Sequence, residues 1–232
     1  MARRPARERS ESNGPAKTNR EKIIDALMEL LAEERIEDTG FGAIARRAGL
    51  SLAECRAEFG SVLAVLAAFT KEVDRQVLAG GDTDTEEEPP RERLFDILMR
   101  RLEALAPYKA AIRSLARSAA RDPALAVALN GLTVRSMQWM LTAADISAAG
   151  PKGIVRGQGL ALLYASVMRT WLDDDDPGLA RTMAALDRGL SRGAWWSGLL
   201  DQVCRFVPPR CCPPGRWSRR SRDRTDEEPA AA

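Results

Sequence analysis

The 232-residue chain contains no histidine. Histidine is the commonest general base and a principal zinc ligand, so its absence removes Ser-His and Cys-His catalysis and the usual zinc sites. The four cysteines, at positions 55, 204, 211 and 212, are too few and too unevenly placed for a disulfide framework. No other combination of nucleophile, base and metal ligands is visible. We therefore expect no enzyme activity, no cofactor and no metal.

Long apolar runs are also missing. Residues 1–20 lack the apolar core of a signal peptide, and no uncharged run is long enough to span a bilayer. We therefore expect a cytoplasmic protein. The net charge of +2 is almost neutral, so the chain as a whole shows no charge signature of nucleic-acid binding.

Aromatic residues make up only 5% of the chain, and β-branched residues are rarely clustered. Alanine, leucine and arginine dominate instead, and these residues favour helices. The apolar share of 45% is ordinary for a folded protein. The composition therefore predicts an all-α fold, with room for one or two domains.

A possible helix-turn-helix lies near the N-terminus. Apolar residues recur at helical spacing over residues 44–48 and stop at Gly49, which suits the left-handed position that ends a helix. Ser51 is a natural N-cap for a second helix, with Cys55 and Phe59 on its inner face. The second helix of such a pair can lie in a DNA major groove. The alternative is a plain corner of a helical bundle.

Two amphipathic helices flank this corner. The first starts at Thr18 or Asn19 and runs to about Glu34, and the second runs from about Ser61 to Gly80. Their apolar stripes contain Ile23, Leu27, Leu30 and Leu31 in the first helix, and Leu63, Leu66, Phe69, Val73 and Val77 in the second. Residues 18–79 are therefore predicted to form one N-terminal domain.

In this order the residues resemble the tetracycline-repressor (TetR) family of regulators. The resemblance rests on the first helix, Thr39 as the cap of helix two, the run IARRAGLS at 44–51, Phe59 and the helix after it. It implies a DNA-binding head, a larger helical ligand-sensing domain, and a homodimer formed by the last two helices of that domain.

The resemblance also implies which residues contact double-stranded DNA. These are Thr39, Arg46, Ser51, Leu52, Ala53, Glu54, Arg56 and Ala57. The chain departs from the family where Glu54, Arg56 and Glu58 replace the usual Thr, Tyr and His, and where Val62 replaces a Lys. Carboxylates facing phosphates are repelled, whereas an arginine can read a guanine. We therefore expect DNA binding that is weakened relative to the family.

The N-terminal arm, residues 1–17, is basic. Residues 1–22 carry seven basic and three acidic side chains, an excess of +4. Such an arm can lie along a DNA backbone or simply keep the protein soluble. At the other end of the head, residues 80–90 form an acidic linker without apolar residues.

Residues 91–193 are predicted to form a helical ligand-binding and dimerisation domain. We expect a helix from Pro90 to before Pro107, one over 109–121 with Ile112, Leu115 and Ala116 inward, and one that opens at Asp122. The segment 160–172 is apolar nearly all round, as expected of a helix that serves both the core and a dimer seam. A further helix, with Pro177 in its first turn, completes the seam.

Two features of this domain leave alternatives open. The acidic run at residues 173–176 is either a cation site or a solvated break, and the break is the better interpretation. Several large side chains either line an apolar ligand cavity or pack in an ordinary core. The residues in question are Met137, Met140, Tyr164, Met168 and Trp171.

The last forty residues are unusual. Residues 194–207 form a predicted amphipathic helix, and the basic tail 208–232 is predicted to be disordered. The helix could dock on the dimer or make a weak contact with a membrane surface.

The leading hypothesis is a homodimeric regulator that binds a pseudo-palindromic operator and responds to an apolar ligand. The alternative is a TetR-fold lipid-binding accessory protein, similar to the family that supports ubiquinone biosynthesis, with little or no DNA binding.

Overall fold

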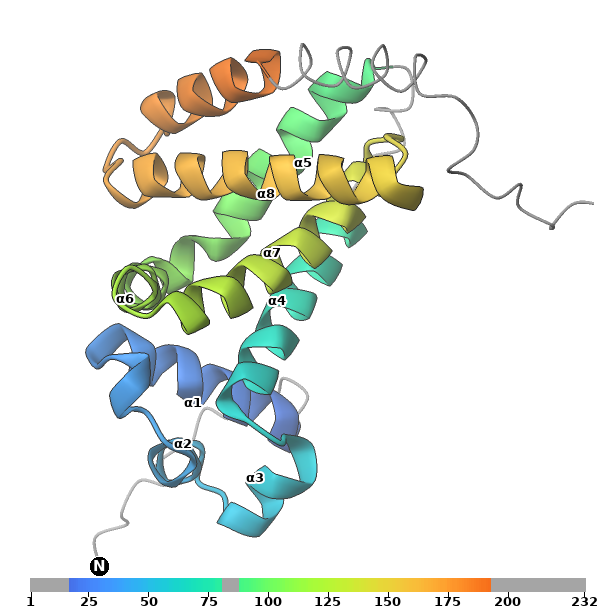
Figure 1. The fold of residues 1–232 in the computed structure, drawn as a ribbon. Coiled ribbons are helices and arrows are strands. Elements are labelled where there is room, and N and C mark those ends of the chain that lie inside the picture. Colours follow the sequence, from blue (N-terminus) through green and yellow to red (C-terminus); the bar gives the residue numbers. More distant parts are fainter. Residues whose placement is uncertain (1–16, 81–87, 193–232) are drawn as a thin grey trace, which may run out of the picture. The chain divides into compact units, whose positions relative to one another are not determined.

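This computed structural model describes residues 17–80 and 88–192, and most of these residues lie in helices (Figure 1). All of these residues belong to one unit, Met1–Ala194, and no strand occurs among them, so the predicted all-α fold is confirmed. The helices are α1 (Asn19–Glu33), η1 (Ile36–Asp38), α2 (Phe41–Ala48), α3 (Leu52–Glu58), α4 (Val62–Ala79), α5 (Pro90–Leu105), η3 (Ala106–Tyr108), α6 (Lys109–Ala119), α7 (Pro123–Ala143) and α8 (Gly150–Leu172). An unlabelled last helix covers residues 180–192.

Several predicted segments lie outside the described residues. They are the basic arm apart from its last residue, the acidic linker over 81–87, the amphipathic helix at 194–207 and the basic tail at 208–232.

The first helix begins where the sequence predicts. Thr18 is the N-cap of α1, and a capping box joins it to Glu21: the Thr18 amide donates to Glu21 Oε2 at 2.7 Å, and the Glu21 amide donates to Thr18 Oγ1 at 3.2 Å. On the opposite face, Ile23, Leu27 and Leu31 are completely buried. α1 thereby becomes the centre of the head, in contact with α2, α3 and α4.

The corner between α2 and α3 also forms as predicted. Gly49 ends α2 in the left-handed conformation, with φ 68° and ψ 34°, which a residue with a Cβ adopts only with strain. Ser51 then caps α3, and Cys55 and Phe59 are buried beneath it. The predicted role of Thr39 is wrong: Gly40 is the N-cap of α2, and the Thr39 hydroxyl instead bonds the Arg35 carbonyl at 2.9 Å.

α4 carries the chain out of the head. Its predicted stripe is buried from Leu66 to Val77, but Leu63 is 40% exposed, because Val65 takes the buried position on the first turn. Further along, α4 packs against α5 and α7, so one continuous helix belongs to both the head and the helical layers above it (Figure 1).

α6 attaches the head to those layers from a second side. It packs on α1 through Ala111, Ser114 and Ser118, and Ser114 Oγ donates to the Glu34 carbonyl at 3.0 Å. Ser118 Oγ donates to Glu37 Oε2 at 2.7 Å. The predicted inward face of α6 is wrong for Ala116, which is exposed. Ile112 and Leu115 are partly buried, pack against the core and line a cavity.

α7 and α8 form the closest helix pair of the upper layers. Gly157 of α8 sits against α7, where an added Cβ would come within 3.1 Å of Gln138 Cγ. On the other side of α8, Leu163 packs on Gly189 of the last helix, and Leu186 is completely buried. The outer surface of this pair keeps large apolar side chains, with Trp139 59% and Leu162 61% exposed.

The acidic run after α8 is not wholly solvated. Asp173, Asp175 and Asp176 are exposed, as a solvated break predicts, but Asp174 is only 2% exposed. Its carboxylate accepts hydrogen bonds from the Thr182 amide at 2.9 Å and the Thr182 hydroxyl at 2.7 Å, and that hydroxyl lowers the pKa of Asp174. Asp174 is therefore a cap for the last helix. Pro177 precedes this helix, which starts at residue 180, so its predicted place in the first turn is wrong.

One buried polar network joins four helices. Arg101 of α5 lies 3.2 Å from the Asp74 carboxylate of α4 and donates to Ser136 Oγ of α7 at 2.9 Å and to the Tyr164 hydroxyl of α8 at 3.1 Å. Ser136 Oγ in turn donates to Asp74 at 2.6 Å. Burial acts to lower the pKa of Arg101, but Tyr164 and Asp74 outweigh it and raise that pKa. Burial raises the pKa of the Tyr164 hydroxyl. The guanidinium therefore stays charged, and the hydroxyl stays neutral.

Replacing one partner of this network should destabilise the protein strongly. We expect Arg101→Met to lower the free energy of unfolding by about 3–5 kcal/mol, because the Asp74 carboxylate loses its buried counter-charge. The double variant with Asp74→Leu removes both charges and should recover much of this loss. Urea unfolding followed by circular dichroism measures both. A double variant that loses as much free energy of unfolding as Arg101→Met, or more, would contradict the pairing.

Candidate functional site

α3 presents nearly its whole surface to solvent. Cys55 is its one buried residue, and Leu52 is 60% exposed although it is apolar. The predicted contact residues of this helix share that exposure: Ser51, Leu52, Ala53, Glu54, Arg56 and Ala57. Arg46 on α2 is exposed as well, whereas Thr39 is 6% exposed and its hydroxyl is already bonded within the chain. The corner therefore presents α3 to solvent, while Cys55 and Phe59 hold it against the rest of the head.

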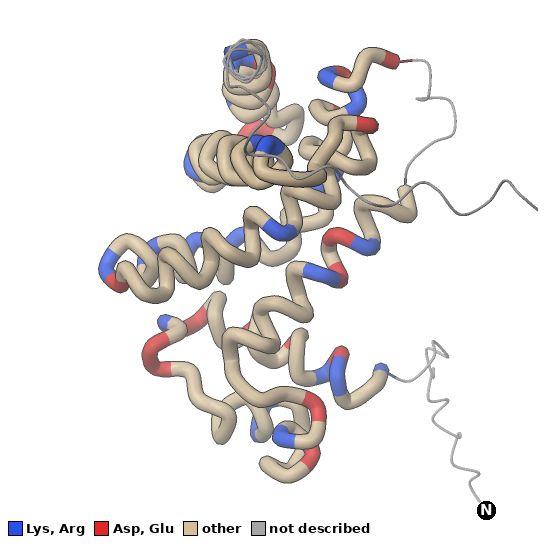
Figure 2. The backbone as a smooth tube through the Cα atoms, turned by 45° about the vertical axis from the view of Figure 1, so that its right-hand side comes forward, with Lys and Arg blue, Asp and Glu red and all other residues tan. Residues whose placement is uncertain are grey.

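The arginines of the corner are not equivalent. Arg47 pairs with Glu33 at 2.7 Å and with Glu29 at 3.4 Å, which ties α2 to α1. Within residues 17–80 and 88–192, neither Arg46 nor Arg56 has a hydrogen bond or an ion pair. Charges of both signs run along this part of the chain (Figure 2). Arg46 and Arg56 are thus the cations of the corner that remain available to an external anion.

Glu54 has an internal role that the sequence analysis missed. Its Oε2 accepts a hydrogen bond from the Ser51 amide at 2.8 Å and from the Ser51 hydroxyl at 2.7 Å, which completes a capping box. Both hydrogen bonds lower the pKa of Glu54, and the one from the Ser51 backbone amide has the larger effect. The carboxylate is therefore held against the first turn of its own helix. The Ser-x-x-Glu spacing is the signal that could have predicted it.

Lys22 and Arg20 of α1 were also not singled out from the sequence as contact residues. The charge of Lys22 contributes to lowering the pKa of Glu54, so the ammonium lies near the start of α3. Arg20 places its guanidinium 4.7 Å from the centre of the Phe59 ring. Two cations of α1 thus lie close to the exposed helix.

A cavity of about 540 Å³ lies among α1, α4, α5, α6, α7 and α8. Its wall is mostly apolar, and its polar side chains are Thr70, Arg101, Asn130, Thr133, Tyr164 and Arg169. Of the residues predicted to line a cavity, Tyr164 and Met168 do so. Met137, Met140 and Trp171 are buried elsewhere in the core. The wall also takes in Met28 of α1 and residues of α4 and α6, none of which the sequence analysis proposed as cavity residues.

The contribution of α4 to this wall connects the cavity to the exposed helix. Leu66, Phe69, Thr70 and Val73 all line the cavity and all lie on α4. Only three residues separate the end of α3 from the start of α4. Any occupant of the cavity would therefore contact the helix that carries α3.

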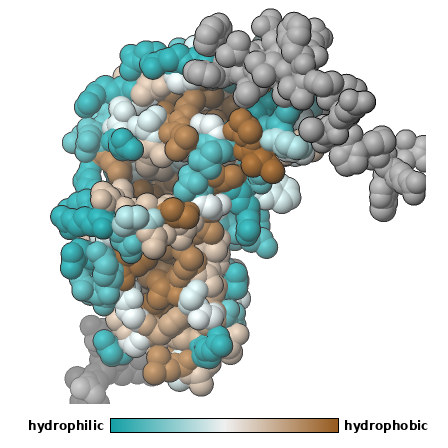
Figure 3. Space-filling model, in the orientation of Figure 1, coloured by the Kyte–Doolittle hydropathy of each residue, from teal (hydrophilic) through white to brown (hydrophobic). Residues whose placement is uncertain are grey.

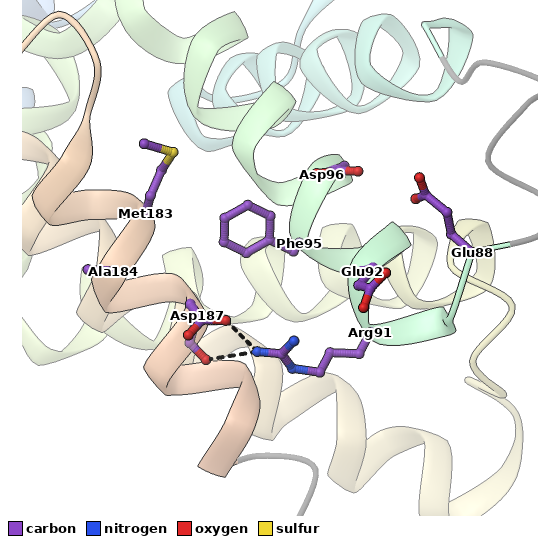
Figure 4. Close-up of a pocket in the computed structure, with 8 residues that line it drawn as sticks. All are labelled: Glu88, Arg91, Glu92, Phe95, Asp96, Met183, Ala184 and Asp187. Atoms are coloured by element: carbon purple, nitrogen blue, oxygen red, sulfur yellow. Dashed lines mark hydrogen bonds and ion pairs between the residues drawn. The ribbon is translucent and has the colours of Figure 1, made fainter.

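A second cleft, of about 470 Å³, lies between the first half of α5 and the last helix (Figure 4). Phe95 and Met183 form its apolar part, and carboxylates of both elements surround it. Arg91 reaches across to the Asp187 carboxylate and donates to Ser191 Oγ at 2.9 Å. Polar contacts of Arg91 therefore join the two helices across this cleft.

The described residues contain neither a metal-binding cluster nor a membrane-spanning helix. No group of three or more histidine, cysteine, aspartate or glutamate side chains in these ranges is arranged to hold a metal ion. None of the helices in the described part is both long and apolar enough to cross a membrane.

Two solved structures share this fold. A TetR transcriptional regulator from Nitrosomonas europaea ATCC 19718 aligns over 76% of this chain and 98% of its own length, with 24% identity and a TM-score of 0.60. A TetR transcriptional regulator from Rhodococcus sp. RHA1 aligns over 75% and 95%, with 20% identity and a TM-score of 0.52. Neither the protein-family models nor the curated protein sequences give a match. The chain therefore has the TetR fold.

The capping role of Glu54 should appear in the pH dependence of stability. Because its pKa is lowered on folding, its stabilising contribution is present above the ordinary carboxyl pKa of about 4.3 and is lost as the pH falls through the folded value. We expect Glu54→Gln to lower the unfolding midpoint at pH 7 and the deficit to shrink towards pH 3.5. Glu58→Gln on the same helix is the control and should change little. A deficit that is constant with pH would contradict this role.

Proposed function

We propose that this chain is a TetR-family transcriptional regulator that binds DNA through α3 as a homodimer and responds to a ligand in the 540 Å³ cavity. The observation that carries the proposal is the exposed α3, held behind the left-handed turn at Gly49 in a TetR fold. A helix that is exposed on all sides but one is suited to entering a groove.

The charges of the corner support DNA binding of modest strength. Arg46, Arg56 and Lys22 are positioned to meet phosphates or a base edge, and phosphate neutralisation supplies most of the non-specific affinity. Glu58 is exposed on α3 and would be repelled by phosphates. Glu54 is already hydrogen-bonded to Ser51, which keeps its charge close to the helix end. We therefore propose that base recognition depends chiefly on Arg56.

The outer apolar surface supports a homodimer. Val155 and Leu162 of α8 are 51% and 61% exposed. Apolar side chains gather over the part of the molecule where α8 lies (Figure 3). Exposed apolar patches mark interaction surfaces, and two copies of a helix pair bury such a surface as a four-helix bundle.

A ligand in the cavity can change DNA binding because α4 forms part of the cavity wall. The head can move only with α4, and the buried Asp74–Arg101 pair holds α4 against α5, α7 and α8. A ligand that fits one position of α4 better than another shifts the population between the two. In a dimer, that shift alters the spacing of the two α3 helices and hence operator affinity.

The lipid-binding alternative is less well supported. Among the described residues, the reasons to expect little DNA binding are the carboxylates of Glu54 and Glu58 on α3. Glu54 is used within the chain, because it caps α3. Glu58 is then the one repelled charge that remains on α3, so the regulator is the better proposal. The predicted helix at 194–207 lies outside the described residues and does not bear on this choice.

DNA binding is tested by sequencing the genomic fragments that the purified protein enriches, and by titrating the best fragment at fixed salt. We expect Arg56→Ala to cost about 1–3 kcal/mol on that site and little on random DNA. Glu58→Gln should raise binding to all sequences, since it removes one repelled charge. Fluorescence anisotropy measures each.

Two results would count against this part of the proposal. An equal loss on all sequences for Arg56→Ala would make that residue a phosphate contact rather than a base contact. Enrichment of no fragment at all would remove the regulator proposal itself.

The dimer is tested with Leu162→Glu. This side chain is 61% exposed in one chain, so the variant should fold, yet a dimer would bury the new carboxylate without a partner and should dissociate. Val127→Glu, at a 72% exposed position on α7, is the control and should stay dimeric. A charge at Leu186 would not test the dimer, because this side chain is buried within one chain and its replacement would disturb folding. Sedimentation equilibrium gives the answer, and a monomeric wild type at micromolar concentration would refute the dimer.

A further inference from the structure

The charged side chains that line the 540 Å³ cavity are all of one sign. The lining contains two arginines, Arg101 and Arg169, and no aspartate, glutamate or lysine among the described residues. Most of the other lining residues are apolar, and several of them are alanines. A ligand with a cationic group would therefore meet no counter-charge in this wall, whereas an anionic group would meet two guanidinium groups.

The deeper arginine is already neutralised. Arg101 is 5% exposed and lies against Asp74, Ser136 and Tyr164, so its charge and its donors are used within the chain. A ligand anion placed there would compete with the Asp74 carboxylate for one buried cation, at the cost of desolvating a second negative charge. The inner end of the cavity therefore favours an uncharged group.

The outer arginine is placed differently. Four lining residues are exposed, namely Ala116, Ala120, Ala165 and Arg169, so the cavity opens beside α6 and α8. Arg169 lies in the last turn of α8 and has no hydrogen bond or ion pair to another described residue. The mouth thus combines three small apolar side chains with one unpaired guanidinium.

The carboxylates that follow α8 leave this guanidinium available. Asp173 lies 4.0 Å from Arg113, and Asp175 lies 3.7 Å from Lys109. Each of these carboxylates therefore has a cation of its own on α6. An incoming anion would be the natural partner for Arg169.

We infer that the cavity binds an amphipathic monocarboxylate of the medium-chain fatty acid class, with its chain inside and its carboxylate on Arg169. The planar guanidinium matches a carboxylate through two parallel hydrogen bonds. A volume of about 540 Å³ is suited to a small apolar molecule. This inference rests on the proposed ligand-binding function and names the chemistry of its ligand.

The test uses isothermal titration calorimetry of the full chain with three probes that share a ten-carbon tail: sodium decanoate, decan-1-ol and decyltrimethylammonium. We expect decanoate to bind roughly tenfold more tightly than decanol, and the ammonium to bind most weakly. Arg169→Gln should reduce decanoate affinity to that of decanol and leave decanol unchanged. Arg169→Lys keeps the charge and should keep part of the preference.

A matched control is Arg135→Gln. Arg135 is an exposed arginine of α7 that does not line the cavity, so this variant loses the same charge away from the mouth and should bind decanoate like the wild type. Equal loss in both variants, equal affinity for decanoate and decanol, or a preference that survives Arg169→Gln would each overturn the inference. Binding of none of the probes would overturn it as well. DNA enrichment, measured separately, shows whether the regulator proposal fails with it.

Discussion

The structure depends on a buried charge pair that most of the fold is arranged to satisfy. Arg101 and Asp74 lie in the apolar stripes of α5 and α4, where an unpaired charge would be very costly. Ser136 and Tyr164 complete the hydrogen bonds from two further helices. Because each buried group is bonded by the others, the network is satisfied in the arrangement in which these four helices pack together. The same pair fixes α4, the helix that leads out of the head.

The head and the upper layers are therefore joined in two ways. α4 passes through both, and the serines of α6 hydrogen-bond to the end of α1 and to η1. The cavity lies between these two connections, with walls from both parts. A molecule that enters it would contact both of these connections, and the proposed coupling of a ligand to the exposed helix rests on this arrangement.

The corner shows how local charges can mislead when they are taken one at a time. Glu54 looks like a carboxylate aimed at DNA, yet it caps its own helix, and the Arg47 guanidinium is used within the chain, where it binds Glu33. What remains for an external partner is Arg46, Arg56 and the neighbouring Lys22, against the exposed Glu58. The balance is slightly positive, which suits weak general attraction with specificity left to few residues.

Local rules were enough for the helices of the head. Thr18, Gly49 and Ser51 act through backbone groups within four residues, so the sequence by itself determined where α1, α2 and α3 begin or end. Only the tertiary structure decided which helix faces meet. α6 turned its serines to α1, Met137 and Trp171 went to the core, and Arg101 met Asp74, because these outcomes depend on partners distant in sequence. Periodicity shows that a helix has an apolar face, but not whether that face borders a core, a cavity or a second copy of the chain.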